Sequence, residues 1–106
     1  MSESAIAVID APAHHRYEIT VDGALAGFTQ YRDNDQVRTF PHTLIEPEFG
    51  GRGLATQLIR QALDHTREQG RSVIPLCEAV QRFISKNTEY AELVPADRRA
   101  EFGINE

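Results

Sequence analysis

The spacing of apolar residues changes abruptly in the middle of the chain, and three glycines within four residues mark the change. In residues 16–21 apolar and polar side chains alternate, which is typical of a strand with one buried face. From Leu54 onward apolar side chains recur at helical spacing, as the buried stripe of an amphipathic helix. The glycine-rich segment 50–53 therefore joins a β-rich half of the chain to a helical half.

The β-rich half predicts an antiparallel meander of three strands. The predicted strands span residues 16–21, 24–31 and 36–45. Asp22-Gly23 is a strong hairpin signal, and residues 33–35 form a second cluster of turn residues. Because Pro41 has no amide proton to donate, we expect a bulge or an unpaired edge position within the third strand.

The helical half predicts a helix, a short strand and a second helix. The first helix ends at Gly70, a residue type suited to helix C-termini. Residues 72–74 form a buried strand closed by Pro75, and a shorter helix ends near Asn87. The order β-β-β-α-β-α predicts a single α/β domain, more narrowly a mixed α+β sheet with helices packed against it.

We expect the domain itself to cover residues 14–96. Residues 1–13 are small, polar or weakly apolar, and they predict a loose leader or an edge strand. The apolar cluster around Tyr90 packs a final turn onto the core, and residues 97–106 form a charged tail.

Composition excludes several classes of protein. The chain has 106 residues, of which 41% are hydrophobic and 25% charged, as in folded soluble domains. A single cysteine forms neither an internal disulfide nor a structural zinc cluster. No apolar run approaches the ~20 residues that span a bilayer, and Glu3 and Asp10 stand where a signal peptide is basic. We therefore expect a cytoplasmic protein without a membrane partner.

The distribution of charge suggests a small anionic ligand. The net charge of −5 argues against a nucleic-acid binder. Residues 52–86 nevertheless carry six basic and three acidic side chains, which leaves five basic and thirteen acidic ones for the rest. The alternative is a solvated helix face rich in arginine.

The glycine-rich segment is suited to binding phosphate. Glycines let successive N–H groups point into one concavity, and Arg52 and the following helix dipole add positive charge. A flexible or packing loop is the alternative. The P-loop pattern is absent, and a dinucleotide fold, with Thr56 in the third glycine position and Glu78 as ribose ligand, conflicts with the preceding meander.

Residues 45–58 resemble the acetyl-CoA loop and helix of the GNAT-type N-acetyltransferases, whose signature is [QR]-x-x-G-x-[GA]. Gly53 and Ala55 match its two small positions, while Gly50 stands in the first place. Residues 17–94 are similar to the very short, stand-alone GNAT-like proteins. The matching residues are Gly27, Phe28 and Tyr31, His42 and Thr43, Pro75 and Cys77, and Phe83, Glu89 and Tyr90. Residues 78–79 and 87–88 depart from that subgroup on the acceptor side.

The resemblance implies a GNAT-like fold that binds acetyl-CoA and transfers its acetyl group to an amine. The diphosphate would lie on the amides of residues 51–56, and the pantetheine arm would pair with Leu44 and Ile45. The implied cofactor residues are Leu44, Ile45, Gly50, Gly51, Arg52, Gly53, Leu54, Ala55, Thr56, Arg82, Lys86 and Asn87.

Three side chains are catalytic candidates. Cys77 is a nucleophile that either accepts the acetyl group transiently or lines the thioester pocket, unless it is inert filler. His42 and Glu46 are candidate general bases, and a histidine that only links strand and helix is equally expected at position 42. Since so short a chain lacks the extra strands that wall the acceptor site in longer enzymes, a non-catalytic CoA-binding regulatory module is the alternative. We expect a monomer or a weak homo-oligomer.

Overall fold

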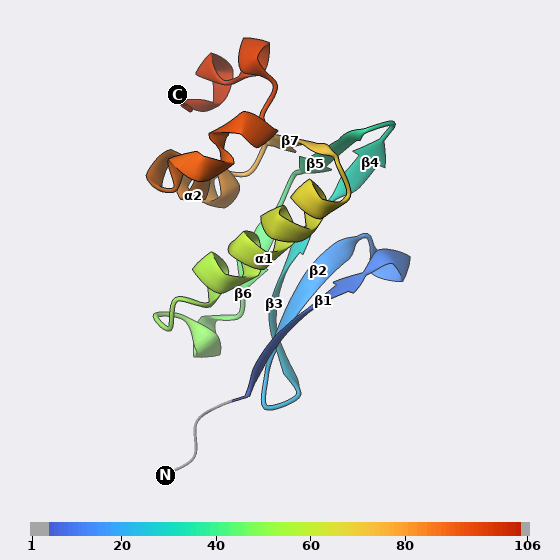
Figure 1. The fold of residues 1–106 in the computed structure, drawn as a ribbon. Helices are drawn as coiled ribbons and strands as arrows, with labels where there is room; N and C mark the ends of the chain where they lie inside the picture. Colours follow the sequence, from blue (N-terminus) through green and yellow to red (C-terminus); the bar gives the residue numbers. More distant parts are fainter. Residues whose placement is uncertain (1–4, 105–106) are drawn as a thin grey trace.

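A four-stranded antiparallel sheet is built from the first half of the chain, in the order β1-β2-β3-β6 (Figure 1). The computed structural model describes residues 5–104. The strands are β1 (Ile6–Ala11), β2 (Arg16–Val21), β3 (Ala24–Gln30) and β6 (Thr43–Ile45). The predicted hairpin joins β2 to β3, because Asp22 and Gly23 both take positive φ, at 51° and 84°.

A second, three-stranded sheet has the order β4-β5-β7. Its strands are β4 (Arg32–Asn34), β5 (Val37–Phe40) and β7 (Ser72–Pro75). Strand β5 pairs antiparallel with β4 and parallel with β7. Residues 33–35 were predicted to be only a turn, whereas Asp33 and Asn34 belong to a strand and the turn lies at residues 35–36.

The predicted third strand over residues 36–45 is wrong as a single strand. Its first half, β5, pairs with β7, and its second half, β6, pairs with β3. The change of sheet occurs at Pro41 and His42, where the missing amide proton of proline interrupts the ladder. The main chain of β6 thus diverges from that of β7, and the candidate site lies at this divergence.

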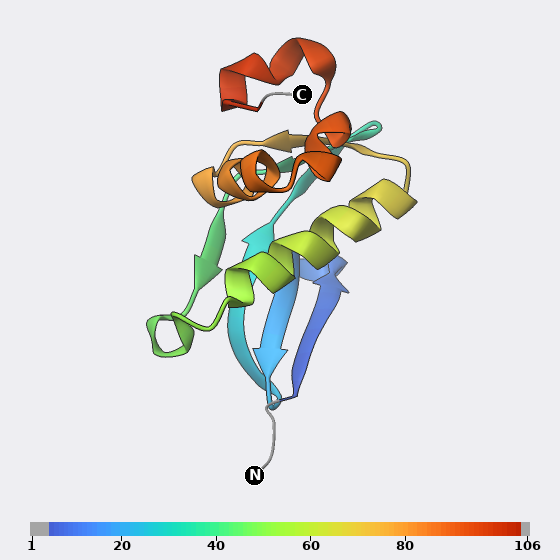
Figure 2. The ribbon, with the colours of Figure 1, turned by 60° about the vertical axis from the view of Figure 1, so that its left-hand side comes forward.

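Two helices cover the sheets. Helix α1 (Leu54–Glu68) crosses one face of the four-stranded sheet, and α2 (Glu78–Lys86) lies beside α1 and β7 (Figure 2). The apolar stripe of α1 packs on the inward side chains of β2, including Ile19 and Val21, which confirms the predicted amphipathic helix. Short 3-10 helices cover Pro12–His14, Pro47–Phe49, Thr88–Leu93, Ala96–Arg98 and Ala100–Phe102.

Both ends of the described chain pack onto the domain. Residues 6–11 are the edge strand β1, the second of the two expected alternatives, and they pair with β2 along their whole length. The leader is therefore not loose over these residues, and residues 1–4 lie outside the described part. The expected tail is anchored as well, because Phe102 and Ile104 are buried. The packed unit extends beyond the expected boundary of 14–96 at both ends.

A buried arginine links the two sheets. Arg38 on β5 is 3% exposed, and its guanidinium donates two hydrogen bonds to Asp33 on β4, at 2.7 and 2.8 Å. It also donates to the Tyr17 hydroxyl on β2, at 2.6 Å, and lies 3.9 Å above the Tyr31 ring. The hydrogen bonds from Arg38 lower the pKa of the Asp33 carboxyl. These contacts tie β4 and β5 of one sheet to β2 of the other.

Candidate functional site

The glycine loop, residues 50–53, leads into the first turn of α1. Gly51 and Gly53 have φ of 77° and 73°, a conformation that side chains rarely adopt, and a Cβ on either would meet nothing within 4 Å. The loop is exposed, and the Arg52 guanidinium lies 5.5 Å from the Phe49 ring centroid. The main chain here is open to a ligand.

Among the described residues, none bonds to the first amides of α1. Its N-cap residue is Gly53, no side chain caps it, and its first turn contains no acidic residue. Within the described chain, the first amide after the loop that donates to a main-chain carbonyl is that of Gln57, to Gly53 at 3.3 Å. The preceding amides and the positive end of the helix dipole are therefore available to an anion.

A groove of about 170 Å³ lies between the start of α1 and α2; we call it the α1–α2 groove. Five of the residues expected at the cofactor line it, namely Ala55, Thr56, Arg82, Lys86 and Asn87. Ile59, Ala79 and Phe83 line it too and were not among the residues expected at the cofactor. The side chain of Asn87 is occupied, since its amide donates to the Phe83 carbonyl at 2.9 Å and accepts from Arg60 at 3.3 Å. The two cations are exposed at the groove.

Strand β6 is the edge of the four-stranded sheet next to this region. The carbonyl of His42 and the amide of Glu46 both bond to β3, at 2.8 Å each. Because alternate residues of an antiparallel strand point to opposite edges, Leu44 also faces β3, while Thr43 and Ile45 direct their main-chain groups outward. The expected pairing of a ligand with Leu44 is therefore corrected to Thr43 and Ile45. Gly27 permits the close approach of β3, since a Cβ there would lie 2.4 Å from the Leu44 carbonyl oxygen.

Cys77 lies where β6 and β7 diverge. It follows β7 and is the N-cap residue of α2, and its amide donates to the Phe40 carbonyl on β5 at 3.0 Å. Its Sγ is 3.2 Å from the Thr43 hydroxyl oxygen on β6, which is 2.8 Å from the Thr29 hydroxyl oxygen on β3. The half-buried thiol thus bridges the two sheets.

The two candidate bases take different positions. His42 is exposed, and its ring packs edge-on against Phe28 with centroids 5.9 Å apart. Glu46 is half-buried at the N-cap of the 3-10 helix before the glycine loop. The structure records no side-chain contact between either residue and Cys77 within the described chain. Both flank β6, one at each end.

Comparison with known proteins identifies the family. The family model described as GCN5-related N-acetyl-transferase matches residues 16–93, well over half of the chain. This chain belongs to the GCN5-related N-acetyltransferase (GNAT) family. It is accordingly an acyltransferase, and the resemblance seen in its sequence is confirmed.

A solved structure supports the same fold. The solution structure of a protein from Staphylococcus aureus described as GCN5-like matches with a TM-score of 0.66 and 20% sequence identity. The match covers 84% of this GNAT chain and 87% of the other one, so the mixed α+β architecture is shared over most of both chains. No curated protein matches the sequence. Among the residues that the structure describes, no helix combines the length and hydrophobicity of a membrane span.

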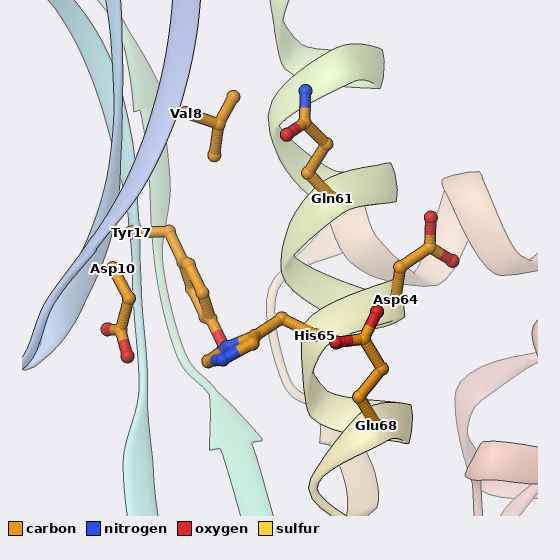
Figure 3. A pocket seen from close by; sticks show the side chains of 7 residues that line it. All are labelled: Val8, Asp10, Tyr17, Gln61, Asp64, His65 and Glu68. Carbon is orange, nitrogen blue, oxygen red and sulfur yellow. The ribbon is translucent and has the colours of Figure 1, made fainter.

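The GNAT domain has a second cavity that the sequence did not reveal. It measures about 400 Å³ and lies between β1, β2 and the second half of α1; we call it the β1–α1 cavity (Figure 3). Its lining residues are Val8, Asp10, Tyr17, Gln61, Asp64, His65 and Glu68. The lining residues come from two segments that lie about 50 residues apart in the sequence. Strand β1, which is partly buried, closes one side of the cavity.

Hydrogen bonds fix the floor of the β1–α1 cavity. The Tyr17 hydroxyl accepts from Arg38 at 2.6 Å and is also hydrogen-bonded to Nδ1 of His65 at 2.7 Å. Burial raises the pKa of Tyr17, an effect that Arg38 partly offsets. Asp10 accepts from the Tyr31 hydroxyl at 2.6 Å. These groups satisfy one another, which fits a structural role.

Proposed function

We propose that this GNAT domain binds acetyl-CoA at the glycine loop and the α1–α2 groove and transfers the acetyl group to an amine. The observation that carries the proposal is the N-terminus of α1, which has neither a capping side chain nor an acidic residue in its first turn. Helix N-termini in proteins are usually capped by a side-chain oxygen. An uncapped one behind an open glycine loop is suited to the diphosphate of the cofactor.

The residues of the site fit the cofactor along its length. The amides of residues 51–56 would hold the diphosphate. Gly51 and Gly53 leave the space in front of these amides open, and a Cβ at either position would occupy it. Arg82 and Lys86, at the other wall of the groove, would bind the phosphate-bearing nucleotide end. The outward main-chain groups of Thr43 and Ile45 would pair with the amides of the pantetheine arm, as an added strand would.

The chemistry needs little more than placement. Bound acetyl-CoA would supply a thioester carbon that an amine can attack, so that the amide bond forms as the carbon–sulfur bond breaks and CoA leaves as the thiol. The half-buried Cys77 lies at the end of the pantetheine strand, where it either takes the acetyl group transiently or lines the pocket. His42 or Glu46, through water, would accept the proton that the amine releases.

The setting of the protein is part of the same proposal. Cys77 is a free thiol in the structure. A free, half-buried thiol at the reactive end of the site functions in a reducing compartment, so we place the protein in the cytoplasm. The acceptor is an amine, and size-exclusion chromatography would show whether the protein is the expected monomer or weak homo-oligomer.

Calorimetric titration with acetyl-CoA tests the proposal, and Gly70 offers a matched control. Gly53 and Gly70 have nearly the same φ, 73° and 72°, and a Cβ on either meets nothing within 4 Å. Gly53→Leu and Gly70→Leu therefore carry a similar backbone strain, about 1–2 kcal/mol. We expect Gly53→Leu to abolish measurable binding and Gly70→Leu to keep it.

Equal binding by both variants would contradict the proposed phosphate site. Turnover is then measured by the loss of thioester absorbance with a panel of amines. Tight binding without turnover of any amine would favour the regulatory, non-catalytic alternative.

A further inference from the structure

Three side chains form a line of hydrogen bonds across the divergence of the sheets. Thr29 on β3 stands opposite Thr43 on β6, and their hydroxyl oxygens are 2.8 Å apart. The Thr43 hydroxyl oxygen is in turn 3.2 Å from Cys77 Sγ. Sheet register places the two threonines side by side on the face that α1 covers, since Thr29 is also paired with Tyr17.

Burial determines the direction of these hydrogen bonds. Thr29 is 0% exposed, and the structure gives its hydroxyl one side-chain partner among the described residues, Thr43. A buried hydroxyl that donates to nothing is costly, so the Thr29 proton points to the Thr43 oxygen. The Thr43 hydroxyl keeps its own proton, which it can donate to the sulfur of Cys77. A sulfur that has lost its proton can only accept, so Thr43 is the donor whenever Cys77 acts as a nucleophile.

We propose that Thr43, backed by Thr29, is a positioning residue that holds the Cys77 sulfur and donates a hydrogen bond to it when the sulfur acts as a nucleophile. The inference rests on the proposed function, in which Cys77 lies beside the thioester. A hydroxyl that donates to sulfur favours the anionic form, which is the nucleophilic one. Thr43 keeps its own proton throughout, and it acts only through the sulfur.

The main chain completes the positioning. The Cys77 amide is bound to the Phe40 carbonyl on β5, while its sulfur is bound to Thr43 on β6. Cys77 is therefore tied to both sheets, through its main chain to β5 and through its side chain to β6. Cys77 and Thr43 are both half-buried, which leaves the sulfur accessible to a small reagent.

Alkylation of Cys77 by iodoacetamide at pH 7 tests the inference without the cofactor. Cys77 is the one cysteine in the sequence, so the rate reports this thiol alone. Thr43→Val keeps the shape of the side chain and removes the hydroxyl. We expect it to slow alkylation about tenfold. Thr43→Ser restores the hydroxyl and should restore the rate.

Two further variants complete the design. Thr29→Val removes the hydroxyl that holds the Thr43 oxygen in place, so alkylation should slow severalfold. Thr39→Val is the matched control, since Thr39 is a half-buried threonine on β5 without a recorded link to Cys77. Its alkylation rate should equal that of the wild type. A melting curve for each variant establishes that it is folded, and Thr29→Val carries the test if Thr43→Val does not fold.

The outcomes separate this inference from the proposed function. Wild-type alkylation rates in folded Thr43→Val or Thr29→Val would overturn it, as would a Thr43→Ser variant as slow as Thr43→Val, because the methyl group would then matter and not the hydroxyl. Absence of acetyl-CoA binding in the wild type would instead overturn the proposed function and leave the alkylation result unchanged.

Discussion

Replacing Arg38 by methionine tests how the two sheets are held together. Arg38 is 3% exposed, and its guanidinium bonds to Asp33 on β4 and to Tyr17 on β2, so it connects the two sheets. Removing one partner of a fully buried ion pair costs about 3–5 kcal/mol. The Asp33 side chain is 34% exposed and can regain water, which places the expected loss near the lower limit, about 3 kcal/mol.

Urea and thermal unfolding, followed by far-ultraviolet circular dichroism, measure this loss. For a chain of this size, about 3 kcal/mol corresponds to a fall of roughly 12 °C in Tm. Arg32→Met is the matched control, because Arg32 is an exposed arginine on β4. Its free energy of unfolding should stay within about 0.5 kcal/mol of the wild type.

A loss below about 1 kcal/mol for Arg38→Met would refute the reasoning. A double-mutant cycle with Asp33→Asn then identifies the interaction responsible. If the ion pair carries the effect, the double variant should be less destabilised than the sum of the two single variants. Additive losses would mean that Arg38 acts through its contacts with Tyr17 and Tyr31 and not through its ion pair with Asp33.

Three further predictions follow from the same contacts. Gly27→Ala should lower stability by about 1–3 kcal/mol and weaken acetyl-CoA binding, because its Cβ would displace the main chain of β6; an unchanged Tm would contradict this. Hydrogen bonds from Arg38 lower the pKa of Asp33 in the folded state, so the charged carboxylate stabilises the fold above its unfolded pKa of about 3.9. This stabilisation is lost as the pH falls through the folded pKa. The difference in the free energy of unfolding between the wild type and Asp33→Asn should therefore shrink from pH 6 to pH 3. Arg82→Gln combined with Lys86→Gln should weaken acetyl-CoA binding about tenfold and reduce its salt dependence, whereas Arg98→Gln, which lies outside the α1–α2 groove, should have no effect in the same titration.

The sequence predicted those parts of the fold that depend on local pattern. The alternation in residues 16–21, the Asp22-Gly23 turn and the apolar stripe that begins at Leu54 all correspond to elements of the structure. Each is set by neighbours within a few residues, either through turn conformation or through burial of one face.

The parts that the sequence missed depend on partners far away in the chain. Pro41 indicated an irregularity in the third strand, but only the pairing of β5 with β7 and of β6 with β3 makes it a change of sheet. Residues 6–11 are a strand because β2 offers them an edge. The contact of Tyr17 with His65 joins residues 48 positions apart, and no local pattern announces it.

The features of the candidate site likewise include some that a local pattern predicts and others that depend on distant partners. The glycine loop is a local motif, and its open amides followed from the glycines themselves. The assignment of Leu44 to the edge that faces the ligand was wrong. Which residues of β6 face β3 depends on the pairing register of the two strands, and the sequence does not show that register. The link from Thr43 to Cys77 spans two sheets and needed the fold.

The most direct test of the account is a nuclear magnetic resonance titration of the ¹⁵N-labelled protein with acetyl-CoA. The account predicts that the largest changes in amide shift fall on residues 51–56, the amides that would hold the diphosphate, with smaller changes along the α1–α2 groove. Shifts confined to the β1–α1 cavity, or no shifts at millimolar acetyl-CoA, would contradict it.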